Sequence, residues 1–352
     1  MIRFGCDYLE GCHPGILERL RETNMEQTPG YGRDTHCERA KELIRRAVGV
    51  PEAEVHFLVG GTQTNTVVIK SLLSPCEGAV CVDNGHINVH ESGAIESTGH
   101  KVLPLPGAEG LMEAAVLRRY LEDFHSDSTK EHRVQPGMVY ISHPSEFGTL
   151  YTRRQLEELH AVCGEFGLPL FLDGARLGYG LMAPGTDVTL ETLAELCDVF
   201  YIGGTKVGAL FGEAVVLPRP GRVRSFRTII KQQGGLLAKG RLLGIQFEAL
   251  FEPPQGGDAH DAVYFEISKH AVQQALRIRK AFEARGIPML YNSVTNQQFP
   301  VLTQKQYDAL GRDFSFELWQ RMEDGRLATR FCTSWATLAA NVDILVSAVG
   351  GL

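Results

Sequence analysis

The stretch FLDGARLGYGL, residues 171–181, begins as an apolar segment and continues directly into Asp173, Arg176 and three glycines. A helical pattern, RRQLEELHAVCGEFG (153–167), precedes it, with apolar residues recurring on one helix face. Short, apolar strands that alternate with helices indicate a mostly parallel sheet covered on both faces. Because such sheets bind ligands at the carboxyl ends of their strands, Asp173 lies where a ligand is expected.

Further segments extend this pattern along the chain. We expect strands in EVHFLVG, GAVCVD, KVLPL, GMVYIS, LPLFLD, CDVFYIGG and GEAVVLP, which begin at residues 54, 78, 101, 137, 168, 197 and 212. Long helical segments then dominate (235–252 and 261–286), before short strands mix with helices. FEPPQGGD (251–258) is the best candidate for a boundary. The sequence therefore predicts a large α/β domain over 1–250, whose N-terminal segment can also contact the small domain or a neighbouring subunit, and a smaller α/β domain over 251–352.

Composition and charge limit the classes of partner. The chain has 352 residues, of which 43% are hydrophobic, and a formal net charge of −7. No run of like charges stands out, so neither a nucleic acid nor an anionic membrane is expected as a partner. There is no stretch of 18 consecutive apolar residues and no apolar segment typical of a signal peptide. We therefore expect a cytoplasmic protein.

The cysteines and histidines do not predict a metal site. The eight cysteines contain no C-x-x-C pair and no zinc-type spacing, so most are expected to be small buried residues. His86 and His90 are four residues apart, which suits a metal on a helix, but no third ligand is obvious nearby.

The stretch LVGGTQTN (58–65) predicts a strand that ends in Gly60 and Gly61, with Thr62 opening a helix. Free N–H groups and the helix dipole make such a turn an anion site suited to phosphate. On this motif alone, the simpler interpretation is an ordinary capped helix. The pattern is neither a Walker loop nor G-x-G-x-x-G, which argues against dinucleotide binding.

Asp173 and Lys206 are each ambiguous alone and become informative when they are considered together. Asp173 could face a protonated ring nitrogen with Arg176 near an anionic oxygen of the same ligand, or the two could form a local ion pair. Lys206, in GGTKVGALFG, could form a Schiff base if it is desolvated, or could be a solvated loop residue. A phosphate-type turn, an aspartate at a strand end and this lysine follow in the order typical of a pyridoxal-phosphate enzyme.

Five stretches carry a resemblance to a known family: GGTQTN, GHINVHESGAIESTGHKV, FLDGARLGYGL, DVFYIGGTKVGALFGEAVV and RFCTSW, which begin at residues 60, 85, 171, 198 and 330. The chain resembles, over nearly its whole length, the threonine aldolase and beta-eliminating lyase family of fold-type-I pyridoxal-phosphate enzymes. The resemblance implies an aminotransferase-like, three-layer αβα large domain and a smaller C-terminal domain. It also implies pyridoxal 5'-phosphate as cofactor, an amino acid as substrate, and a homodimer or homotetramer with active sites at the subunit interface.

The resemblance assigns roles around the cofactor. Lys206 is similar to the lysine that binds the cofactor covalently, and Asp173 to the partner of the pyridinium nitrogen. Gly61 and Thr62 match part of the phosphate cradle, and His86 matches the residue that stacks on the cofactor ring.

Other matching positions concern the substrate and the neighbouring subunit. Arg176 and Arg330 resemble the arginines around the cofactor and the substrate carboxylate, which an arginine can bind with two N–H groups. Cys6 belongs to this group and replaces a serine that many aldolases carry. Lys231, in KQQGG, resembles a basic residue near the phosphate of the neighbouring subunit, and the segment of Tyr31 also tends to meet that site.

The resemblance implies retro-aldol cleavage of a β-hydroxy-α-amino acid to glycine and an aldehyde. His86, His90 or a water molecule could serve as the base. A β-elimination that yields a keto acid and ammonia is the alternative with the same cofactor. A non-catalytic Rossmann-like binding protein is a third alternative, against which Asp173, Lys206 and Arg330 together argue.

Overall fold

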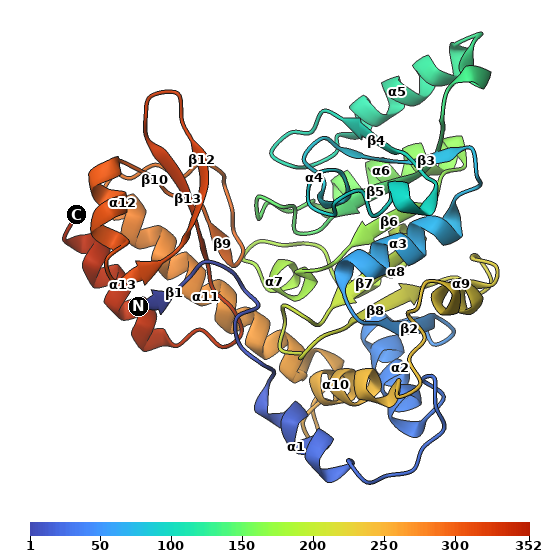
Figure 1. Cartoon of the computed structure of the whole chain (residues 1–352), viewed down its shortest axis with the longest axis horizontal. Helices are drawn as coiled ribbons and strands as arrows, with labels where there is room; N and C mark the ends of the chain where they lie inside the picture. Colours follow the sequence, from blue (N-terminus) through green and yellow to red (C-terminus); the bar gives the residue numbers. More distant parts are fainter.

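A seven-stranded sheet forms the core of the larger part of the protein, on the right in Figure 1, in the computed structural model, which describes residues 1–352. The strands are β2 (Glu54–Leu58), β3 (Glu77–Val82), β4 (Val102–Leu105), β5 (Gln135–Ser142), β6 (Leu170–Asp173), β7 (Val199–Gly203) and β8 (Glu213–Leu217). Their order is β2-β8-β7-β6-β5-β3-β4. β8 is antiparallel to both neighbours, and all other neighbouring pairs are parallel. The predicted mostly parallel sheet is confirmed.

Helices cover both faces of this sheet. Alternate strand residues point to opposite sides, and the residues on both sides are apolar. In β5, Val139 and Ile141 belong to one hydrophobic cluster, whereas Met138 and Tyr140 belong to another. The first cluster includes residues of α2 (Thr35–Val48), α5 (Ala114–Ser126), α6 (Arg153–Phe166), α8 (Leu190–Leu196), α10 (Arg241–Phe251) and α11 (Val263–Ala284). The second includes residues of α3 (Gly61–Leu72) and α9 (Phe226–Gln232). The result is the expected three-layer αβα arrangement.

The sequence fixes both ends of the helix that leads into β6. At the start of α6, Thr152 and Gln155 form a reciprocal capping box, which satisfies two backbone N–H groups. Gly167 ends the helix in the left-handed region, with a φ of 69°. The chain then enters β6, whose last residue is Asp173.

A separate group of elements forms around the C-terminal residues. β13 (Leu327–Cys332) pairs with β10 (Val301–Leu302), β12 (Glu317–Arg321) and β9 (Gln297–Gln298), and β1 (Ile2–Arg3) pairs with β11 (Phe314–Ser315). A third hydrophobic cluster joins Phe4 to residues of α11, α12 (Gln304–Leu310) and α13 (Ala339–Gly350). The N-terminal strand therefore packs with C-terminal elements (Figure 1). α11 contributes to two of the hydrophobic clusters. The predicted division at residue 250 stays a prediction.

One predicted helix starts later than the sequence pattern indicated. The pattern favoured a helix over 235–252, but α10 begins only at Arg241. Gly234 lies in the left-handed region after α9, with a φ of 73°, and Gly240 directly precedes α10. Glycine favours such a turn over continuation of a helix. The remaining helices are α1 (Pro14–Glu22), α4 (His86–Val89) and α7 (Leu177–Leu181).

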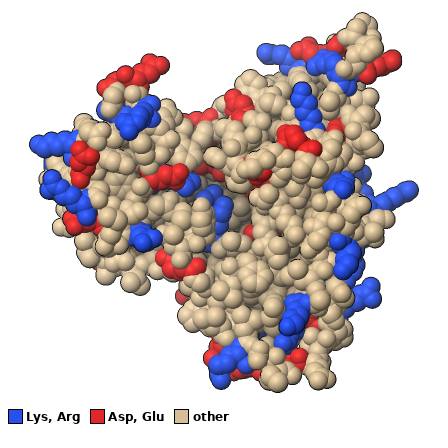
Figure 2. Space-filling model, viewed as in Figure 1, with Lys and Arg blue, Asp and Glu red and all other residues tan.

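The surface is hollowed between the C-terminal elements and the seven-stranded sheet, and both basic and acidic side chains lie in this hollow (Figure 2). No helix is long and apolar enough to cross a membrane. In the register of β5 and β6, Ser142 is opposite Asp173, so the two strands end together.

The backbone directly after Asp173 leaves no space for a side chain. A Cβ atom on Gly174 would lie 1.9 Å from the carbonyl oxygen of Tyr201, which is backbone and cannot rotate away. We expect Gly174→Ala to lower stability by about 1–3 kcal/mol or more. Gly164→Ala, in α6, is the matched control: a Cβ atom there meets nothing within 4 Å and should stabilise by about 0.5–1 kcal/mol. Thermal unfolding measures both, and equal melting temperatures would contradict this close approach.

Candidate active site

A cavity of about 300 Å³ lies where β6 and β7 end and α3 begins. This volume is at the lower end of the range, about 300–1,000 Å³, of pockets that bind small molecules. It is lined by Tyr8, Val59, Gly60, Gly61, Thr62, Asn65, His86, Glu91, Glu146, Asp173, Ala175, Tyr201, Thr205, Lys206 and Glu213. Five predicted site residues are therefore in its wall: Gly61, Thr62, His86, Asp173 and Lys206. The other four, Cys6, Arg176, Lys231 and Arg330, are not.

Four hydrogen bonds hold the buried carboxylate of Asp173. The Tyr140 hydroxyl (2.6 Å) and the Asn65 amide (3.0 Å) donate to Oδ2. The Tyr201 hydroxyl (2.6 Å) and the backbone N–H of Ala175 (3.0 Å) donate to Oδ1. Burial raises the pKa of Asp173, but the charge of His86 and these hydrogen bonds outweigh it and lower the pKa. Asp173 is thus a fixed, ionised carboxylate at neutral pH.

A second buried carboxylate orients His86. His86 Nδ1 lies 2.8 Å from Glu91 Oε1, which also accepts a hydrogen bond of 2.7 Å from the amide of Asn65. Burial lowers the pKa of His86, but the bond to Glu91 and the charges of Glu146 and Asp173 raise it overall. Asn65 bridges Glu91 and Asp173, so one amide links the two carboxylates.

Lys206 follows β7 in a turn whose backbone is tied to the sheet. Its amine makes no hydrogen bond or ion pair within the chain, whereas its carbonyl accepts one from the Tyr179 hydroxyl. Burial and the positive charge of Arg176 lower the pKa of Lys206, although nearby carboxylates partly oppose them. A lowered pKa increases the share of neutral amine, which is the nucleophilic form.

Glu213 is a buried acid beside Lys206. It is 3% exposed, and it accepts hydrogen bonds from Gly204 N (3.0 Å) and Thr205 Oγ1 (2.7 Å). Burial raises the pKa of Glu213 to about 8, although Thr205 and Lys206 act in the opposite direction. Glu213 is therefore mostly protonated at neutral pH.

The turn between β2 and α3 exposes backbone N–H groups to the cavity. Gly60 is the N-cap, and α3 already begins at Gly61, one residue before the predicted start. Gly60 makes no side-chain cap, so the first N–H groups of the helix remain free for an anion. A Cβ atom on Gly61 would lie 3.2 Å from the Tyr201 hydroxyl, so a residue larger than glycine would crowd that hydroxyl.

The two predicted substrate arginines are held by acids outside the cavity wall. Arg176 binds Asp7 through Nε (2.7 Å) and Nη2 (3.0 Å), and does not pair with Asp173. Burial raises the pKa of Asp7, but Arg176 outweighs burial and the value falls to about 2. Arg330 pairs with Glu317, lies over the Trp319 ring and has a buried Nε without a partner.

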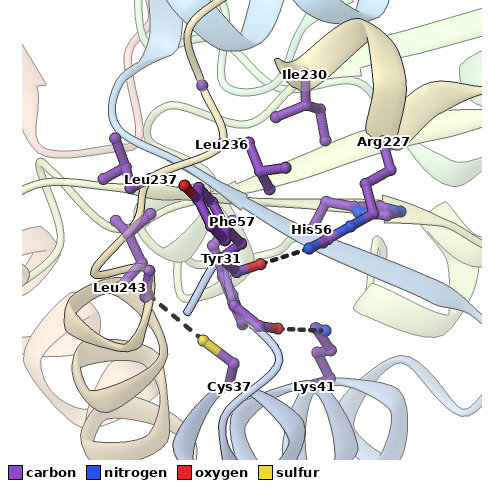
Figure 3. A pocket seen from close by; sticks show the side chains of 13 residues that line it. Tyr31, Cys37, Lys41, His56, Phe57, Arg227, Ile230, Leu236, Leu237 and Leu243 are labelled. Carbon is purple, nitrogen blue, oxygen red and sulfur yellow. Dashed lines mark hydrogen bonds between the residues drawn. The ribbon is translucent and has the colours of Figure 1, made fainter. Parts of the chain in front are cut away.

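Lys231 does not line this cavity and lies instead beside Tyr31. Its amine sits 4.7 Å from the centre of the Tyr31 ring. Next to it, a cavity of about 30 Å³ is lined by Tyr31, Cys37, Lys41 and Arg227 among others (Figure 3). Arg227 donates to the Tyr31 carbonyl (2.6 Å), and Lys41 to the Gly32 carbonyl (3.3 Å). These basic groups hold the segment of Tyr31 to α9 and α2.

Comparisons with known proteins agree with this geometry. The family model of the beta-eliminating lyases matches residues 12–299. This chain belongs to the beta-eliminating lyase family. The predicted family membership is therefore confirmed.

Two similar proteins are both named threonine aldolases. A low specificity L-threonine aldolase of Pseudomonas aeruginosa is 27% identical over 338 residues, which cover 95% of this chain and 93% of that protein. The structure of a Leishmania major threonine aldolase is 42% identical, with a TM-score of 0.93 and coverage of 99% of this chain and 98% of that one. An aspartate aminotransferase structure from Thermus thermophilus shares the fold alone, with 14% identity, a TM-score of 0.72, and coverage of 100% and 91%. The predicted aminotransferase-like fold is confirmed.

Several polar residues of this lyase site were not predicted from the sequence: Asn65, Glu91, Tyr140, Tyr201 and Glu213. Three of them carried a signal. Asn65 ends the quoted stretch GGTQTN, Glu91 is five residues after His86, and Glu213 is an acid at the start of an apolar strand. Tyr140 and Tyr201 gave none, because an aromatic residue within a strand is usually part of the core.

The raised pKa of Glu213 makes the stability of the protein depend on pH. Between the ordinary value of 4.5 and about 8, the folded state holds a proton that the unfolded state releases. The free energy of unfolding therefore falls as pH rises through this window. We expect Glu213→Gln to melt at a similar temperature to the natural protein near pH 5, and at a higher temperature near pH 8 and above.

The exposed variant Glu323→Gln serves as the control, and its melting temperature should follow the natural protein throughout. A difference between Glu213→Gln and the natural protein that stays constant with pH would contradict the raised pKa.

Proposed function

We propose that this chain is a pyridoxal-phosphate-dependent lyase that cleaves a β-hydroxy-α-amino acid, of the threonine, allo-threonine or phenylserine type, to glycine and an aldehyde. The observation that carries this proposal is the pairing, in one cavity, of the fixed carboxylate Asp173 with the unbonded amine of Lys206. The names of its relatives support the same reaction.

The residues present fit the cofactor at each of its polar groups. The free N–H groups at the start of α3, with Gly61 and Thr62, would hold the phosphate. Asp173 would accept a hydrogen bond from the protonated ring nitrogen, His86 would lie against the ring, and Lys206 would bind covalently. When bound, pyridoxal phosphate supplies a sink for the electron pair that is left on Cα when a substrate bond breaks.

The chain's own residues decide which bond breaks. Arg330 and Arg176 would bind the substrate carboxylate, and the partnerless Nε of Arg330 is a buried donor suited to an anion. A carboxylate held in this way fixes the rotation about the Cα bonds, so that Cα–Cβ faces the electron sink. Cys6 adjoins Asp7, the partner of Arg176, and is the third residue proposed near the carboxylate.

We also propose a cytoplasmic homodimer or homotetramer. Lys231 is outside the cavity of its own chain, and Tyr31 beside it is 43% exposed, so both can contact a neighbouring subunit. All eight cysteines are free and six are buried, which suits a reducing compartment.

Lys206→Ala tests the covalent attachment. The purified natural protein, supplied with pyridoxal phosphate, should show a visible absorption band that borohydride bleaches. The variant should lack this band and lose activity, because no other amine of the chain lines the cavity. A natural protein that gains no band with added cofactor would contradict the proposal.

Product analysis with L-threonine, L-allo-threonine and phenylserine tests the reaction. We expect glycine and the matching aldehyde. A keto acid and ammonia would instead assign the β-elimination for which the family is named.

Asp173→Asn tests the role of the fixed carboxylate. The amide keeps the size of the side chain, so the protein should fold, but it removes the charge that pairs with the ring nitrogen. We expect turnover to fall by about 100-fold or more while the circular dichroism spectrum is retained. Unchanged turnover would refute this role.

A further inference from the structure

The cavity wall contains four acidic side chains, and one of them differs from the others. Asp173 accepts four hydrogen bonds, Glu91 binds His86 and Asn65, and Glu213 binds two donors in the turn after β7. Glu146 makes no hydrogen bond or ion pair through either carboxylate oxygen. It is the one acid in the wall whose oxygens are both free to contact a substrate.

The backbone around Glu146 is fixed even though its carboxylate is free. The Ser145 hydroxyl accepts a bond from Phe147 N (3.2 Å), and the Ser145 carbonyl accepts one from Gly148 N (2.9 Å). The Phe147 ring stacks on Tyr291, with centres 4.0 Å apart and planes 7° apart. The loop therefore holds the carboxylate at the cavity.

The charge of Glu146 acts on three groups around the cavity. It contributes to raising the pKa of Lys206, of His86 and of Arg176. These groups are assigned to the cofactor bond, the cofactor ring and the substrate carboxylate. A substrate held among them would present its β-substituent near Glu146.

The other candidate bases are less suited to accept a proton. Glu213 is mostly protonated at neutral pH. The pKa of His86 is raised, which favours the imidazolium, and an imidazolium has no free lone pair. Asp173 is assigned to the ring nitrogen of the cofactor. One oxygen of Glu91 binds His86 and Asn65, and its other oxygen is buried and does not face the cavity.

We propose that Glu146 is the catalytic base that accepts the β-hydroxyl proton of the substrate, an inference that rests on the proposed cleavage reaction. The O–H bond breaks, its proton goes to a carboxylate oxygen of Glu146, and its electron pair forms the carbonyl bond of the aldehyde. The Cα–Cβ electron pair remains with Cα, which later takes up a proton to give glycine.

Glu146→Gln tests this proposal in the holoenzyme, with Glu109→Gln as control. Glu109 is an exposed acid whose carbonyl contacts the same loop, and its side chain is outside the cavity. We expect Glu146→Gln to lower kcat for L-threonine by about 100-fold or more, with little change in KM. Exchange of the glycine α-hydrogen in D2O, which involves no hydroxyl proton, should continue at nearly the natural rate.

Binding measured by calorimetry gives a readout apart from turnover. O-methyl-threonine has no hydroxyl proton, so its ether oxygen would face the carboxylate of Glu146 unfavourably. We expect Glu146→Gln to bind this analogue more tightly than the natural protein does, because a glutamine amide can donate to the ether oxygen. The control should bind it as the natural protein does.

Three results would overturn the proposal, and they are distinguishable. Cleavage by Glu146→Gln at the natural rate would assign the base to another group or to water, and leaves the proposed function intact. An equal loss of cleavage and of glycine exchange would indicate that Glu146 has a structural role and is not the base. Failure of the natural protein to form glycine from any of the three substrates would remove the proposed function itself.

Discussion

The carboxylate of Asp173 is the interaction on which the site depends. A buried charge is tolerated only when it is well hydrogen-bonded, and here the donors come from β5, α3, β7 and the turn after β6. Each donor is therefore a constraint on how these elements pack. The same bonds that hold the sheet and α3 together keep one negative charge fixed in the cavity wall.

The charged groups in and around the cavity have hydrogen-bond or ion-pair partners, with two exceptions. Asp7 neutralises Arg176, and Glu91 partners His86. The amine of Lys206 and the carboxylate of Glu146 have no such partner. Unpaired groups of opposite sign in one partly buried cavity are unfavourable unless a ligand uses them, which is why perturbed and unpartnered groups indicate functional sites. The two exceptions are assigned to the cofactor and to the substrate.

Much of the fold followed from local signals. The apolar runs predicted all seven strands of the central sheet, and the helical pattern over 153–167 matched α6. The late start of α10 was missed because its apolar pattern continues upstream through a glycine turn. Asp173 was found because it ends an apolar strand, and Lys206 because it follows a strand and lies among glycines. Tyr140 and Tyr201 could not be found, because only the packed sheet brings their hydroxyls to Asp173.

The protonation state of the cofactor ring tests the central role of Asp173 most directly. Pyridoxal phosphate labelled with 15N in its ring can be bound to the natural protein and to Asp173→Asn, and the nitrogen shift measured by NMR over a range of pH. We expect the ring nitrogen to stay protonated in the natural protein at every pH at which the protein is folded, and to lose its proton in the variant. A neutral ring nitrogen in the natural protein at neutral pH would contradict the assignment of Asp173.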